Sequence, residues 1–146
     1  MRFSEVIGHE EVRERLLQMV HKDRLTHAIM LCGPQGVGKK ALAISFDCYL
    51  LEQKPEGQEI QEKPESPMLQ NLQHPDLHFT YPTIKLPSMS SDHKPVSEDF
   101  ASEWHELIMA GPYFTMDEWM TAMGGENQQA IITAGESNAL VRKLSL

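Results

Sequence analysis

Long apolar runs are missing from this chain: no stretch of about 18 apolar residues occurs, so the sequence contains no candidate for a membrane-spanning helix. The first residues, MRFSEVIGHEE, carry acidic side chains where a secretory signal peptide would need an apolar core. We therefore expect a cytoplasmic protein without a membrane partner.

Cysteine is scarce as well, with only two among 146 residues. Cys32 and Cys48 do not form a CxxC pair, and both lie in apolar segments. The sequence therefore predicts two small buried core residues and no disulfide framework.

Basic residues are outnumbered, with 13 Lys and Arg against 21 Asp and Glu, which gives a net charge of −8. This balance argues against a domain whose main task is to grip nucleic acid. It leaves room for a protein that serves a DNA-processing machine from a position away from the DNA. The length suits one compact domain, and the 40% hydrophobic content is ordinary for a globular protein.

The apolar periodicity predicts alternating helices and strands. Helices are expected at residues 10–21, 40–51, 97–109 (capped by Ser97) and 115–123, with a last one capped by Ser137. Strands are expected at residues 28–32, 76–81 and 130–133. This order indicates an α/β fold with a parallel sheet, and three strands make a thin sheet, so we expect it to be incomplete at the C-terminal end. The polar stretch 52–73, rich in Pro, Glu and Gln, is expected to be a flexible loop.

Residues 33–40, GPQGVGKK, fit most of the phosphate-loop pattern GxxxxGK[ST]. Gly33, Gly38 and Lys39 match, the expected strand precedes them, and the expected helix follows. With Gly36, these glycines would let backbone N–H groups curl around a phosphate, while Lys39 would reach its oxygens. The loop is a specific signal because the match occurs between a strand and a helix.

The eighth position of the loop departs from the pattern, because Lys40 replaces the hydroxyl that normally ligates magnesium. A charged lysine cannot ligate a metal ion and would repel it. Two interpretations remain open: the loop binds ATP, phosphate or sulfate without turnover, or it is a structural relic. The candidate site residues are Gly33, Gly36, Gly38, Lys39 and Lys40; no catalytic residue and no metal ligand is assigned.

Several segments in the same order resemble the bacterial DNA polymerase III delta-prime family of clamp-loader stators. They are the FSEVIG start, the HA before the first expected strand, GPQGVGK, the helix ALAISFDCYLL, and HPDLHFTYP at residues 74–82. The segment SEDFASEWHELIMAGPYFTMDEWM resembles an insertion of the Bacteroidetes type, at about residues 97–124. The final residues, ESNALVRKLSL, resemble the helix that precedes the family's magnesium-site strand.

The resemblance implies the N-terminal portion of an AAA+ phosphate-loop domain, a three-layer sandwich, over residues 1–146. It implies a clamp-loader subunit that helps to load the sliding clamp on primed DNA during replication. The implied partners are the ATPase and delta subunits, with the clamp and DNA reached through the complex. The chain would then be one component of a nucleotidyltransferase holoenzyme, whether or not it has an activity of its own.

One departure from this family concerns zinc. Its members commonly carry a four-cysteine zinc module between the helix after the loop and the HPD segment. This chain has no cysteine after Cys48, so thiolates cannot bind zinc there and no zinc is expected.

Two other groups of residues suggest sites but have plainer explanations. His74, His78, His93 and His105 could form a metal site with Asp76, although solvated or locally bonded histidines fit their scattered spacing better. Trp104, Tyr113, Phe114 and Trp119 could stack nucleic-acid bases. They lack interleaved basic residues, so a small hydrophobic core is the preferred interpretation.

Two functional hypotheses follow from these patterns. The first is an interaction protein, a clamp-loader stator with a degenerate phosphate loop. The alternative is an ATP-binding or ATP-hydrolysing AAA+ enzyme that uses Lys39 with a different metal site.

Overall fold

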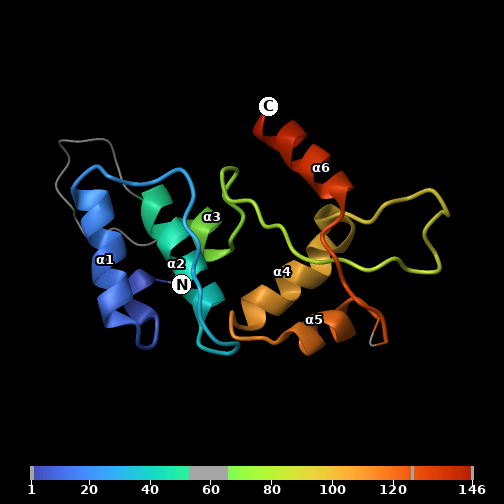
Figure 1. Ribbon diagram of the computed structural model, residues 1–146, viewed down its shortest axis with the longest axis horizontal. Coiled ribbons are helices and arrows are strands. Elements are labelled where there is room, and N and C mark those ends of the chain that lie inside the picture. Colours follow the sequence, from blue (N-terminus) through green and yellow to red (C-terminus); the bar gives the residue numbers. More distant parts are fainter. Residues whose placement is uncertain (1, 53–65, 126, 146) are drawn as a thin grey trace. The chain divides into compact units, whose positions relative to one another are not determined.

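The computed structural model describes residues 2–52, 66–125 and 127–145 (Figure 1). The chain divides into two compact units, Met1–Leu77 (unit 1) and His78–Leu146 (unit 2). Each unit has its own cluster of buried hydrophobic side chains, and each is described separately below.

Unit 1 is built from short and medium helices. It contains the 3-10 turn η1 (Phe3–Glu5), α1 (Glu10–His21), α2 (Lys39–Glu52) and the single-turn helix α3 (Pro67–Gln70). Glu10 and Glu11 lie at the positive end of α1, and His21 lies at its negative end, as the helix dipole favours. The helices predicted at residues 10–21 and 40–51 are thus confirmed, the second with one extra residue at each end.

The core of unit 1 forms where η1, α1 and α2 meet. Its buried residues are Phe3, Val6, Leu16, Leu42 and Phe46. The Phe3 and Phe46 rings lie 5.5 Å apart between centroids, and the Arg13 guanidinium lies 5.6 Å from the centre of the Phe3 ring. Such ring and cation–π contacts add specificity to the burial of apolar area.

Unit 2 contains the 3-10 turn η2 (Ser97–Phe100), α4 (Ala101–Ala110), α5 (Met116–Ala122) and α6 (Ala134–Leu144). Thr115, where a helix was predicted to begin, caps α5: its hydroxyl accepts from the Glu118 N–H, and the Glu118 carboxylate accepts from the Thr115 N–H. The predicted caps at the other two helices are wrong. Ser97 lies inside η2 and bonds to Tyr81, while Ser137 lies inside α6, which begins after Thr133.

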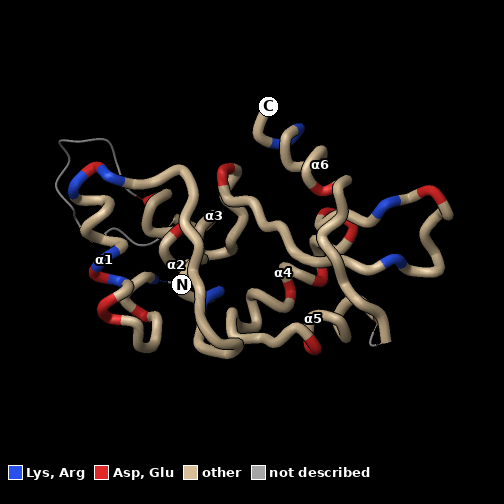
Figure 2. The backbone as a smooth tube through the Cα atoms, in the orientation of Figure 1, with Lys and Arg blue, Asp and Glu red and all other residues tan. Residues whose placement is uncertain are grey.

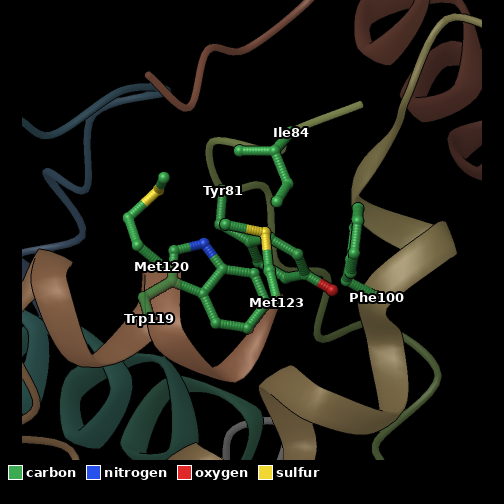
Figure 3. Close-up of a cluster of buried hydrophobic side chains, with 6 residues drawn as sticks. All are labelled: Tyr81, Ile84, Phe100, Trp119, Met120 and Met123. Carbon is green, nitrogen blue, oxygen red and sulfur yellow. The ribbon is translucent and has the colours of Figure 1, made fainter. Parts of the chain in front are cut away.

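The core of unit 2 is aromatic (Figure 3). Its buried residues are Tyr81, Ile84, Phe100, Trp119, Met120 and Met123. Trp119 is only 1% exposed and its indole N–H donates to the Pro82 carbonyl at 2.8 Å. Trp104 stacks on Tyr81 with centroids 4.2 Å apart, and its ring meets that of Trp119 edge-on. This side of the unit is a packed interior.

The predicted parallel sheet is wrong. The described residues form helices and connecting segments, with no strand among them beyond one isolated antiparallel bridge between Thr83 and Ile131. Residues 28–32 are extended but unpaired, and Ile29 and Met30 are 42% and 85% exposed. Their apolar character predicts burial between strands, but no neighbouring strand is present in the described part of the chain to supply it.

The alternation over residues 76–81 has a different outcome. Phe79 and Tyr81 face the aromatic core while His78 and Thr80 are exposed, so the pattern gives the correct facing. The backbone N–H of Tyr81, however, does not pair with a neighbouring strand. It donates a hydrogen bond to the Ser97 hydroxyl at 3.1 Å. An alternating apolar and polar sequence therefore indicates that alternate side chains are buried. It does not by itself show that the backbone pairs with another strand.

The predicted loop at residues 52–73 falls largely on residues 53–65, which lie outside the described part of the chain. Its described end contains α3, where Leu69 is almost fully buried. The region 97–124 contains η2, α4 and α5. Of the two cysteines predicted to be buried, Cys48 is buried but Cys32 is exposed. Among the described helices, none combines the length and apolar character that crossing a membrane would need.

Candidate phosphate site in unit 1

The candidate phosphate loop connects the extended segment 28–32 to α2 (Figure 1). Gly36 and Gly38 have φ angles of 85° and 89°, a region that side chains with a Cβ atom rarely enter. A Cβ atom at Gly36 would meet no atom within 4 Å, so the glycine is required there by the backbone conformation and not by crowding.

Lys39 closes the loop on itself. Its ammonium donates to the carbonyl oxygens of Gly33 and Pro34, at 2.7 and 2.6 Å. These bonds connect Lys39 to the first two residues of the loop, Gly33 and Pro34. An anion that binds in the loop would share this ammonium with the two carbonyls.

The first turn of α2 supplies further donors. The Leu42 N–H donates to the Gly38 carbonyl, and this is the first bond of the helical ladder. The N–H groups before that bond belong to the first turn of α2, the end of a helix at which backbone donors point outward. The sequence also puts two cationic side chains at this end (Figure 2), where the helix dipole is already positive. The arrangement favours an anion and disfavours a metal cation.

His9 is a residue of this region that the sequence analysis missed. Its Nε2 donates to the Val37 carbonyl at 2.5 Å, across 28 residues of chain. His9 precedes α1 with a left-handed φ of 61°, which turns its ring toward the loop. Both the imidazolium and the neutral tautomer with hydrogen on Nε2 can make this bond. No sequence motif predicts the bond between His9 and Val37, because this contact depends on how α1 and the loop fold together.

The histidines considered for a metal site are not brought together. His74 accepts from the Asp76 N–H at 3.2 Å, and His93 bonds the Asp99 carboxylate at 2.8 Å. Among residues 2–52, 66–125 and 127–145, no three His, Cys, Asp or Glu side chains lie close enough to hold a metal ion. The prediction that the chain binds no zinc stays a prediction.

The aromatic residues considered for base stacking belong mostly to the core of unit 2. The Trp104 ring contacts those of Phe114, Trp119 and Tyr81, and all of them belong to or pack against the buried cluster, so the preferred interpretation as a hydrophobic core is confirmed for Trp104, Phe114 and Trp119. Tyr113 is the exception, because half of its surface is exposed.

Comparisons with known proteins give one match. Neither the curated proteins nor the solved structures contain one that matches this chain. A family model described as "DNA polymerase III, delta subunit" matches residues 8–113, which is more than half of the chain. The matched part begins just before His9 and includes all of the candidate phosphate loop, residues 33–40. The chain belongs to this DNA polymerase III family, which is of the clamp-loader type.

Proposed function

We propose that this chain is a clamp-loader subunit of the delta-prime type, in the form found in Bacteroidetes, and that it works in the cytoplasm as a stator. In this role it holds a neighbouring ATPase subunit and the delta subunit in register, so that the complex can open the sliding clamp and place it on primed DNA. The family match supports the clamp-loader role. The VIG, GPQGVGK and HPD segments, in that order, support the finer assignment.

The observation that carries the stator proposal is the chemistry of Lys39 and Lys40. The loop offers ammonium groups and backbone N–H donors, and the oxygen ligand expected for magnesium is replaced by Lys40. Phosphoryl transfer depends on a metal ion that neutralises the charge developing on the phosphate oxygens. A loop of this kind binds phosphate, sulfate or the phosphates of ATP and does not turn ATP over.

Assembly tests the stator role directly. The chain, co-expressed with the ATPase and delta subunits, is expected to purify with them as one complex by size-exclusion chromatography. The Lys39→Ala variant is expected to assemble equally well, because a stator needs its surface and not hydrolysis. A chain that joins no such complex would contradict the proposal.

Nucleotide chemistry tests the loop separately. ATP is expected to bind weakly without magnesium dependence and without measurable hydrolysis, and Lys39→Ala is expected to weaken binding by about tenfold, the loss of one charge-assisted contact. Lys22→Ala, at an exposed lysine after α1, is the matched control and should leave binding unchanged. Lys40→Thr is expected to make binding respond to magnesium. Steady magnesium-dependent turnover that Lys39→Ala abolishes would establish the alternative, an AAA+ enzyme.

A further inference from the structure

A second concave site lies in unit 1, along the middle and end of α2. It is a half-open cavity of about 370 Å³, bounded by α1, by residues 25–31 and by α2. Seven of its ten lining residues are apolar, namely Leu16, Leu25, Ile29, Leu31, Ala43, Phe46 and Leu50. Thr26, His27 and Asp47 are polar, and the exposed surface of the lining is about equally polar and apolar. We call this cavity the α2 groove.

The α2 groove is separate from the phosphate loop. Asp47 lies eight residues after Lys39 on the same helix, which corresponds to about 12 Å along its axis at 1.5 Å per residue. A ligand in the groove therefore contacts α2 two turns beyond the residues that would hold a phosphate.

Asp47 is the charged group of the groove. Burial raises the pKa of its carboxyl above the ordinary value of 3.8, although the residue as a whole is exposed. Within the described residues, no hydrogen bond or ion pair offsets this partial desolvation. A carboxylate that has lost some of its water and gained no cation favours a positively charged ligand.

The shape of the groove favours a chain over a compact small molecule. Its volume is at the small end of the range for ligand pockets, and it is open along one side. Leu25 and Ile29 lie on its rim and are 44% and 42% exposed, so apolar surface continues beyond the cavity.

We propose that the α2 groove docks an extended peptide segment of a partner protein, with an apolar side chain in the cavity and an Arg or Lys side chain at Asp47. The apolar side chain contributes affinity through burial against Leu16, Phe46 and Leu50. The basic side chain contributes selectivity, because an acidic residue in its place meets Asp47 with like charge. This proposal goes beyond the stator role and does not require it.

Titration of the isotopically labelled full chain with acetyl-Leu-Arg-Leu-amide, followed by NMR, tests the proposal. Millimolar peptide is expected to shift resonances of Ala43, Asp47 and Leu50, with the corresponding Glu peptide binding about fivefold more weakly. Asp47→Asn is expected to remove this preference. Glu14→Gln, at an exposed acid on α1, should retain it.

Three results would overturn the proposal. The first is equal binding of the Arg and Glu peptides, or shifts that avoid the groove. The second is binding of arginine amide as tightly as the tripeptide, which would indicate a small-cation site. The third is a change of the groove resonances on dilution of the chain alone, which would indicate a second copy as the occupant. Co-purification with clamp-loader subunits is measured independently, so failure of the stator proposal is distinguishable from failure here.

Discussion

Unit 1 and unit 2 each contain a core of buried hydrophobic side chains, but they use their polar groups differently. In unit 2, polar groups hold the core in place: the Trp119 indole bonds to a carbonyl, and the Glu136 carboxylate, buried at 7% exposure, accepts from the Ser97 N–H at 2.6 Å. In unit 1, the phosphate loop and the α2 groove remain open to solvent. The polar groups of unit 2 thus order its interior, while the loop and the groove of unit 1 lie at the surface.

Because buried polar contacts order the core of unit 2, substitution of Trp119 is expected to destabilise the chain the most. Trp119→Ala is expected to lower the free energy of unfolding by about 3–5 kcal/mol, through the cavity and the loss of its hydrogen bond. Amide hydrogen exchange should show loss of protection throughout unit 2. Tyr113→Ala, at a half-exposed ring, is the control and should cost less than about 1 kcal/mol. Similar costs for the two variants would contradict the assignment of the core.

Leu42→Ala applies the same change to the other core and is expected to cost about 2–4 kcal/mol. Loss of amide protection should be concentrated in α1 and α2, because Leu42 belongs to the cluster that they form. Val12→Ala, at an exposed position on α1, is the matched control. A loss of protection that begins in unit 2 would show that the units do not have independent cores.

Glu136→Ala should cost about 1–3 kcal/mol, because it leaves the buried Ser97 N–H without an acceptor. Glu98→Ala removes an exposed ion pair with Lys143, 3.6 Å long, and should cost less than about 1 kcal/mol. Denaturant unfolding of the two variants measures the difference. If Glu98→Ala proves the more damaging change, the anchoring role of Glu136 is wrong.

Alkaline pH should destabilise unit 2 through Tyr81. Burial, and then the nearby carboxylates of Glu136, Glu103 and Glu98, raise the pKa of its phenol above the ordinary value of 10.0. The unfolded chain therefore loses this proton first. Stability is intact below pH 10 and falls above it by at most about 1.4 kcal/mol per pH unit. Tyr81→Phe should show a flatter profile between pH 10 and 11, and an unchanged slope would exclude Tyr81 as the cause.

Asp47→Asn is expected to have the smallest effect and the opposite sign. Burial raises the pKa of this carboxyl, so its ionised form costs stability at pH values above the raised pKa, and this cost disappears in acid. Because Asp47 is exposed and water screens its charge, the variant should be only slightly more stable than the parent chain at pH 7, and equal to it near pH 3. Glu14→Gln should show neither effect, and a destabilised Asp47→Asn chain would mean that the carboxylate has a favourable partner.

The helices were predictable because their signals are local. Glu10 to His21 carry their own apolar stripe and charges, and Thr115 with Glu118 carries its own cap. The sheet prediction was wrong because strands depend on partners that no local pattern contains. Residues 28–32 are apolar yet unpaired, and Tyr81 satisfies its backbone with Ser97, 16 residues away.

Unit 1 likewise contains site features that the sequence predicts and others that it does not. The glycines and Lys39 are recognisable because phosphate loops need them at fixed spacing. His9 and the α2 groove were not predicted, since both arise from contacts between segments far apart in sequence. Such contacts require the folded chain.

The contact between Tyr81 and Ser97 suggests a use in protein engineering. Three hydrogen bonds join these two residues: Tyr81 N–H to the Ser97 hydroxyl, the Ser97 hydroxyl to the Tyr81 carbonyl, and the Tyr81 phenol to the Ser97 carbonyl. The chain between Tyr81 and Ser97 therefore forms a loop whose two ends are hydrogen-bonded to each other. Ser90 and Ser91 lie in an exposed part of this loop. Because lengthening a closed loop costs only about 0.6 kcal/mol per doubling, a tag or reporter peptide inserted there should leave both cores intact.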